Sequence, residues 1–230
     1  MCMKTVSSVI ILSLIVLFSS CGTTKTADRE KFTVSPYGTV VSSAGIEVYF
    51  SHAKSYTADV DKGDKINVSV RDGSLILSRR GGGRSGGTKV YLSAEKLDAV
   101  ILSGGSRFFS DELKNVKKIS LTTSGGSGVD IKKIDIDECN IAASGGSACS
   151  IRQIKTRRLN VASSGGSTAN IETKRADNVN VAASGGSNVT LTGSADNISA
   201  SASGSASINV TGLKYKNINT NQSGRGNIRK

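Results

Sequence analysis

The hydrophobic and polar positions in the C-terminal part of this chain follow a pattern that recurs about every 20 residues. The intervals between its recurring four-residue marks are 21, 20, 20, 20, 19 and 20 residues. Self-similarity at such a period indicates a solenoid of stacked units. The marks are SGGS at Ser103, Ser124, Ser144, Ser164 and Ser184, SGSA at Ser203 and SGRG at Ser223.

Apolar residues keep a fixed phase to the mark, five and three residues before it and five and seven after it. Around Ser124, for example, these are Ile119, Leu121, Val129 and Ile131. A spacing of two places them on one face of a short strand on each flank of the mark. One unit cannot bury that face alone, but strands stacked about 4.8 Å apart can. We therefore predict an all-β, single-stranded parallel β-helix with ~20-residue rungs. Two clear strands and a looser third side are typical of the right-handed form, although the residues alone do not determine handedness.

The glycines of the mark suit a sharp corner, because glycine reaches positive φ without a Cβ clash. The flanking serine hydroxyls can bond backbone groups at the turn. A phosphate-binding loop is the rival interpretation, but it needs a Lys and a Ser or Thr at set spacing before a helix. Seven copies also make no sense for one nucleotide. We therefore interpret the mark as a stacking corner.

Polar residues also recur in register on the outward positions. Four residues before the mark stand Asn140, Asn160 and Asn180, and then Asn219 two rungs later. Stacked amides can bond along the axis of such a helix. Asp137, Arg157 and Asp177 alternate in sign at another position, which favours pairing between neighbouring rungs. These rows are typical of register devices, and a glycan-binding stripe is the functional alternative.

The N-terminus has the pattern of an export signal. Lys4 precedes an apolar run over residues 6–18, which is shorter than the roughly 20 residues of a membrane span. The following LFSSCG resembles the lipobox of bacterial lipoproteins, so Cys21 is the expected site of lipid attachment, palmitate among its acyl chains. We predict a signal peptide over 1–20, a polar tether over 21–31 and a β-helix domain over 32–230. Ordinary cleavage that leaves a soluble periplasmic protein is the alternative.

The charge favours anionic partners. The formal net charge is +12, and it falls to +11 when Lys4 is removed with the signal. Lipid head groups, lipopolysaccharide, acidic glycans and surface proteins are candidates. Export argues against nucleic acid, and five Tyr and five Phe scattered along the chain form no recognisable base-stacking platform. Arg79, Arg80 and Arg84 lie in the sequence RRGGGRSGG, which predicts a flexible basic loop.

The sequence contains few candidate catalytic residues. His52 is the single histidine, and the nearby Glu47, Asp59 and Asp61 do not single out a partner for it. β-Helix glycosidases and lyases need grouped carboxylates. The densest group here faces cations one rung on, Lys155 and Arg157, which favours ion pairs over a catalytic cleft. That group comprises Asp130, Asp135, Asp137 and Glu138. We expect no enzyme activity, no cofactor and no metal site.

Cys139 and Cys149 take positions that carry aliphatic residues in other rungs, so both should face the interior. An exported compartment permits a disulfide. Its Cα atoms must come within about 7 Å, however, whereas facing sheets lie nearer 10 Å apart. Two buried free thiols are the favoured interpretation, and a disulfide stays open.

The N-terminal third carries strand patterns without the mark, with RDGS at 71–74 as a turn. We therefore expect irregular strands over 32–102 and marked rungs over 103–230. The order of AGIEVYF at 44–50, DGSLILS at 72–78 and KVYLSAEKLDAVILSGGS at 89–106 resembles the head GIN domain family of auto-transporter adhesins, from about Phe32 onward. The resemblance implies a right-handed β-helix in an envelope lipoprotein, and it brings no functional residues.

These observations together predict a non-catalytic cell-envelope lipoprotein. We expect it at the outer membrane, facing the periplasm or the surface. It would act as an adhesin-like binding module for glycans, matrix or envelope proteins. A carbohydrate-active β-helix enzyme and a purely structural envelope protein are the two alternatives.

Overall fold

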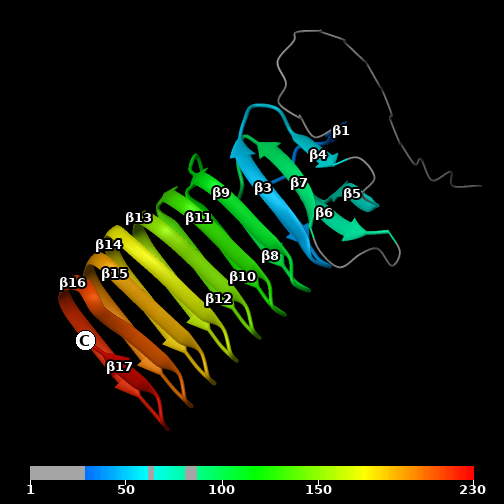
Figure 1. The fold of residues 1–230 in the computed structure, drawn as a ribbon. Helices are drawn as coiled ribbons and strands as arrows, with labels where there is room; N and C mark the ends of the chain where they lie inside the picture. The colour runs from blue at the N-terminus through cyan, green and yellow to red at the C-terminus, as the bar shows by residue number, and fades with distance from the viewer. Residues whose placement is uncertain (1–28, 62–64, 81–86) are drawn as a thin grey trace, which may run out of the picture.

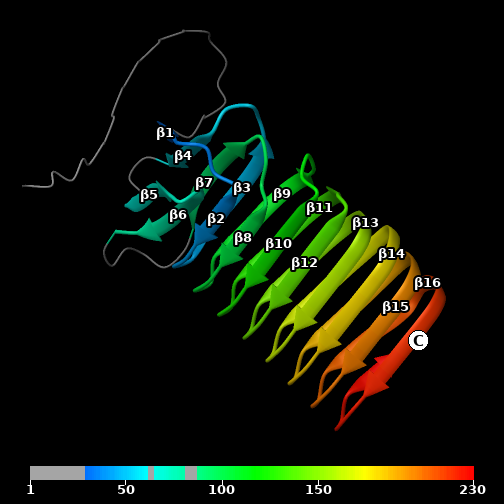
Figure 2. The same ribbon diagram turned by 180° about the vertical axis from the view of Figure 1, so that it is seen from behind.

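The computed structural model describes residues 29–61, 65–80 and 87–230, and every regular element in these ranges is a β-strand. The strands wind into an elongated solenoid (Figure 1, Figure 2). Parallel partners lie one repeat apart, as in the pairs Ile119↔Cys139 and Leu159↔Val179. The predicted all-β solenoid with rungs of about 20 residues is therefore confirmed.

Each rung contributes to two sheets that meet at the marked corners. The sheet that precedes the corners, here called the pre-corner sheet, includes β8 (Ala99–Leu102), β10 (Lys118–Thr123) and β12 (Glu138–Ala143). The post-corner sheet includes β9 (Arg107–Leu113), β11 (Gly128–Asp135) and β17 (Asn227–Arg229). Longer strands supply both sheets in the rungs between: β13 (Ala148–Ser163), β14 (Thr168–Ala183), β15 (Asn188–Ala202) and β16 (Ser207–Gln222).

The looser third side expected from the sequence is a bend within single strands from β13 to β16. The β13–β14 ladder shifts register between Ile151 and Lys155, and the β14–β15 ladder shifts between Thr173 and Ala176. Such irregularities bend a strand sharply while the ladder continues on both sides of them. The chain can therefore pass from one sheet to the other without a separate loop.

The segment 32–102, expected to hold irregular strands, contains two more rungs of the solenoid. One is β2 (Thr39–Ser42) with β3 (Ile46–His52), and the other is β6 (Ser74–Arg79) with β7 (Thr88–Ala94). β2 pairs with both β6 and β8, and β3 pairs with both β7 and β9. The rung that comes first in the chain therefore lies second in space. After β3 the chain forms the outer rung, β6 with β7, and β8 and β9 then pair with the opposite edges of β2 and β3.

Antiparallel strands cover the N-terminal end of the solenoid. β4 (Thr57–Asp61) pairs with β7, and β1 (Arg29–Thr33) pairs with β4. β5 (Ile66–Arg71) forms a hairpin with β6, closed by Asp72 at φ 49° and Gly73 at φ 70°. The predicted RDGS turn is thus confirmed. This cap pairs the outer edges of β6 and β7, which would otherwise present free backbone groups.

The last residue of the first six marks lies in the core, where a serine hydroxyl needs a partner. These buried residues are Ser106, Ser127, Ser147, Ser167, Ser187 and, in the SGSA mark, Ala206. Ser167 Oγ donates to Ser164 O at 2.7 Å, which confirms the expected serine-to-backbone bond at the turn. Ser127 Oγ, by contrast, finds no partner among the described residues.

This difference predicts opposite results for one substitution at two corners. Ser167→Ala should lower the free energy of unfolding by about 1–3 kcal/mol, because it removes bonds of a buried hydroxyl. Ser127→Ala should leave stability unchanged or raise it, because the buried hydroxyl there is unpaired and Ala206 occupies the same position naturally. Urea denaturation of both variants gives the comparison. Equal losses would show that the Ser127 hydroxyl is also bonded in solution.

Both internal cysteines are free thiols in the core, as favoured from the sequence. Cys139 is 0% and Cys149 2% exposed, and the structure has no bond between them. Burial raises the pKa of the Cys139 thiol far above its usual range. Burial, followed by the nearby Asp130 charge, raises the pKa of Cys149 to about 12.

The thiols should therefore be unreactive in the folded protein. With Ellman's reagent at pH 8, folded wild type and the Cys139→Val/Cys149→Val double variant should give equal titres, because thiolate and access are both lacking. In denaturant without reductant, wild type should exceed the double variant by two thiols. An excess of zero would instead reveal a disulfide.

Candidate functional site

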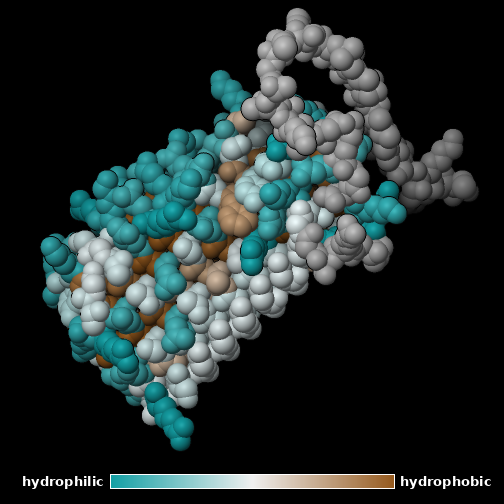
Figure 3. All heavy atoms as spheres, viewed as in Figure 1, coloured by the Kyte–Doolittle hydropathy of each residue, from teal (hydrophilic) through white to brown (hydrophobic). Residues whose placement is uncertain are grey.

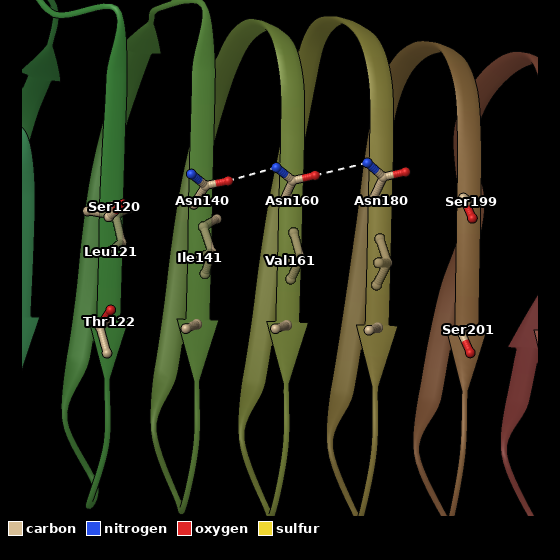
Figure 4. Close-up of a pocket in the computed structure, with 14 residues that line it drawn as sticks. Ser120, Leu121, Thr122, Asn140, Ile141, Asn160, Val161, Asn180, Ser199 and Ser201 are labelled. Atoms are coloured by element: carbon tan, nitrogen blue, oxygen red, sulfur yellow. Dashed lines mark hydrogen bonds between the residues drawn. The ribbon is translucent and has the colours of Figure 1, made fainter.

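A shallow groove of about 600 Å³ runs across the outer face of the pre-corner sheet (Figure 4). Most of its lining residues take the outward positions four and two residues before each corner, and buried apolar residues lie between them. We call it the Asn–Ala groove. Its lining residues are Ser120, Leu121, Thr122, Asn140, Ile141, Ala142, Asn160, Val161, Ala162, Asn180, Val181, Ala182, Ser199 and Ser201.

The predicted asparagine ladder lies in this groove. Asn160 Nδ2 donates to Asn140 Oδ1 at 2.7 Å, and Asn180 Nδ2 donates to Asn160 Oδ1 at 2.9 Å (Figure 4). Asn219 is separated from the ladder by Ser199, its partner in β15. Beside the amides, the exposed Ala142, Ala162 and Ala182 form a row of methyl groups. The groove therefore offers amides, hydroxyls and methyls, and none of the described residues that line it is charged.

Charged residues border the groove and pair between rungs. Glu138 accepts from Asn140 Nδ2 at 3.0 Å and lies 3.0 Å from Lys118 Nζ and 3.4 Å from Arg158 Nη1. The hydrogen bond from Asn140, then that from Lys118, lowers the pKa of the Glu138 carboxyl. This carboxylate is thus ionised and fully engaged at neutral pH.

The other acidic residues singled out from the sequence are paired as well. Asp137 lies 3.1 Å from Arg157, Asp135 3.5 Å from Lys155 and Asp130 3.4 Å from Arg152. Asp177 pairs along its own strand with Arg175, at 3.9 Å. The expected pairing of the acidic group with cations one rung on is confirmed. Within the described residues, no three His, Cys, Asp or Glu side chains gather to hold a metal.

His52 lies outside the groove and is bonded through both ring nitrogens. Nδ1 is 3.2 Å from Glu95 O, and the backbone N–H of Lys114 donates to Nε2 at 3.1 Å. Two of the nearby acids are engaged elsewhere, Glu47 with Tyr49 and Asp61 with Arg29. The imidazole therefore joins three segments of backbone, and no carboxylate among the described residues pairs with it as a catalytic partner would.

An aromatic ladder on the post-corner sheet was missed in the sequence. Tyr49 stacks on Tyr91 with ring centroids 5.1 Å apart and on Phe109 at 4.9 Å. The Arg29 guanidinium covers the Tyr91 ring at 3.5 Å. The shared pattern of Val48-Tyr49-Phe50 and Val90-Tyr91-Leu92 could have indicated that the two tyrosines take equivalent positions. The sequence does not indicate that they stack, because the order of these rungs in space differs from their order along the chain.

The Tyr49 ring lies between the other two rings, so both of its faces are covered. On the face shown in Figure 3, hydrophilic side chains cover most of the rungs and hydrophobic ones show between them.

In the predicted basic loop, Arg79 Nη2 donates to Gly45 O at 3.4 Å. Arg84 and Cys21, together with the signal peptide and most of the tether, lie outside the described residues. No helix in the described ranges is long and apolar enough to span a bilayer.

The fold is a β-solenoid whose pre-corner sheet carries an uncharged groove. The family model described as "Putative auto-transporter adhesin, head GIN domain" matches residues 36–152 and 140–229. The chain belongs to this family. Family membership supports an adhesin-like binding role at the cell envelope and is in keeping with a protein that is not an enzyme.

Solved structures have the same fold. A protein described as a putative adhesin from Bacteroides fragilis NCTC 9343 superposes with a TM-score of 0.66 at 17% identity, covering 90% of this chain and 97% of that one. One so described from Parabacteroides merdae ATCC 43184 gives 0.61 at 17%, covering 85% and 95%. A putative lipid binding protein from Parabacteroides distasonis ATCC 8503 gives 0.51 at 19%, covering 88% and 96%. No curated protein matches the sequence.

Proposed function

We propose that this protein is a non-catalytic lipoprotein, anchored through Cys21, that binds a neutral glycan chain along the Asn–Ala groove. The observation that carries the proposal is the groove itself, which extends from β10 to β15 and has no charged residue in its lining as far as the structure describes the chain. Amide and hydroxyl groups match sugar hydroxyls, while the alanine row accommodates the apolar face of a sugar ring. A peptide would need side-chain pockets for specificity.

The net charge of the chain favours an anionic ligand, but the distribution of that charge favours a neutral ligand in this groove. Many cations on the border are paired with carboxylates, as Arg157 is with Asp137 and Lys216 with Asp196. Exposed ion pairs of this kind contribute little to stability. They do, however, cancel much of the local positive field. The remaining charge supports loose attraction to an anionic envelope surface.

A binding experiment with matched face variants tests the proposal. Ala162→Arg fills the groove with a long charged side chain, and Ala148→Arg places the same change on the post-corner sheet. Both alanines are exposed. On an array of glycans and matrix proteins, wild type and Ala148→Arg should bind a neutral glycan saturably, and Ala162→Arg should not.

Other outcomes would assign another function. Undiminished glycan binding by Ala162→Arg would place the ligand outside the groove, and binding only to matrix or envelope proteins would replace the glycan. Turnover of any polysaccharide would make the protein a carbohydrate-active enzyme. If nothing binds, a structural envelope role gains support.

The lipid anchor is tested separately: alkynyl palmitate should label wild type in cells and leave Cys21→Ser unlabelled.

A further inference from the structure

The asparagine ladder has a direction, and one charged residue sets it. A carboxylate only accepts hydrogen bonds, so Glu138 requires the NH₂ end of Asn140. The carbonyl oxygen of Asn140 then faces Asn160, which must present its own NH₂ group, and Asn180 follows in the same way. All three amides are thus aligned along the solenoid axis by the charge at one end.

Two cations beside Glu138 keep its carboxylate charged, and this charge sets the direction of the ladder. Lys118 and Arg158 lie on the rungs on either side of Glu138, at 3.0 and 3.4 Å from its carboxylate oxygens. A neutral glutamic acid could donate to the ladder instead of accepting from it, but these two cations hold the carboxyl in its charged form. The direction of the ladder is therefore fixed at neutral pH.

The opposite end of the ladder is an open acceptor. Asn180 Oδ1 accepts no hydrogen bond from any described residue, and the position paired with Asn180 in β15 is the shorter Ser199. Figure 4 shows this carbonyl oxygen directed toward the rung of Ser199, where the chain of dashed hydrogen bonds ends. Asn180 is exposed, whereas Asn140 and Asn160 are half-buried. Aligned hydrogen bonds polarise one another, which strengthens the last acceptor.

We propose that Asn180 Oδ1 accepts a hydrogen bond from a hydroxyl group of the bound glycan in the space beside Ser199. Glu138 is the positioning residue for this acceptor. The inference rests on the proposed function and deepens it. It places one defined contact in the groove and gives the ligand a donor at that point. The short side chain of Ser199 leaves room for this donor where an asparagine would extend the ladder.

A pair of matched variants tests the open acceptor. Ser199→Asn extends the ladder at its acceptor end, so the new NH₂ group donates to Asn180 Oδ1. Ala148→Asn adds the same amide on the post-corner sheet, outside the groove, and leaves Asn180 Oδ1 open. With cellohexaose, maltohexaose and chitohexaose as probes in calorimetry, Ser199→Asn should bind about tenfold more weakly than wild type. The Tm of Ser199→Asn should rise by about 2 °C. Ala148→Asn should bind as wild type does.

Glu138→Gln tests the positioning role without a ligand. A glutamine amide can donate or accept, so the ladder is free to reverse. The side-chain ¹⁵N resonances of Asn140, Asn160 and Asn180 should then all shift, although Asn140 alone touches residue 138. A shift confined to Asn140 would overturn the role of Glu138. Unchanged glycan binding by Ser199→Asn would overturn the Asn180 contact alone, whereas failure of wild type to bind any probe would overturn the neutral-glycan function and this inference with it.

Discussion

Gly185→Val is expected to lower the free energy of unfolding by roughly 3 kcal/mol or more, since a left-handed φ costs a side chain about 1–2 kcal/mol and overpacking adds about 1–3 kcal/mol. Gly185 has a φ of +67° at the corner before β15. A Cβ built there would lie 3.1 Å from Gly165 N and 3.2 Å from Gly165 O, both backbone atoms of the rung beneath. Neither atom can move without disturbing the stack.

The neighbouring glycine supplies the control. Gly186 has no positive φ, and its Cβ would meet Gly165 O at an ordinary 3.6 Å, so Gly186→Ala should be nearly neutral. Gly126 is intermediate, because its φ is +76° but nothing lies within 4 Å of the added Cβ. Gly126→Val should therefore damage folding less than Gly185→Val does. Urea denaturation read by circular dichroism, with hydrogen exchange for each rung, measures these differences.

The same variants test the interpretation of the corner. If the corner serves stacking alone, glycan binding should be lost only in proportion to unfolding. A Gly185 or Gly126 variant that keeps its stability but no longer binds would show that the corner contacts the ligand.

Phe108→Ala is expected to cost about 3–5 kcal/mol of unfolding free energy, the usual range for removing a buried phenylalanine. Phe108 is 0% exposed and faces Phe50 inside the solenoid, with ring centroids 6.0 Å apart. The rungs here hold the largest side chains of the core, and the cavity lies between two sheets that cannot close over it. Thermal melting and hydrogen exchange should both show the loss, centred on β3, β9 and β11.

Phe109→Ala is the matched control, because the next residue along β9 points to the opposite side of the sheet. Phe109 is half-buried and stacks at the end of the aromatic ladder. Removing this ring should cost about 1 kcal/mol, the contribution of an aromatic pair. If both alanine variants lost the same stability, the aromatic ladder would be as important to folding as the core.

The periodic part of the molecule could be predicted from the sequence because its contacts repeat. In the marked rungs the inward positions, such as Ile119 and Leu159, recur at a constant distance from the corner, and the parallel register Cys139↔Leu159 follows directly from that distance. The stacking of Asn140, Asn160 and Asn180 followed from the same arithmetic. Where every rung makes equivalent contacts with its neighbours, one period determines both sheet and register.

The N-terminal rungs could not be derived in that way. β2 and β3 come first in the chain, yet they lie between β6–β7 and β8–β9, and no repeat in the sequence encodes an order that differs from the order along the chain. The stacking of Tyr49 between Tyr91 and Phe109 depends on that order. These contacts join residues far apart in the sequence, and only the folded chain specifies which segments become neighbours.

The sequence by itself thus determined the rung, the glycine corner, the inward aliphatic positions and the existence of an amide ladder, since each follows from spacing within a strand or between equivalent strands. The tertiary structure alone decided the order of the first rungs and the direction of the ladder. The direction depends on a side-chain contact that occurs in one rung only, so the 20-residue period does not specify it. Glu138 lies 3.0 Å from Asn140 Nδ2 and is held ionised by cations on both sides, and an ionised carboxylate can only accept.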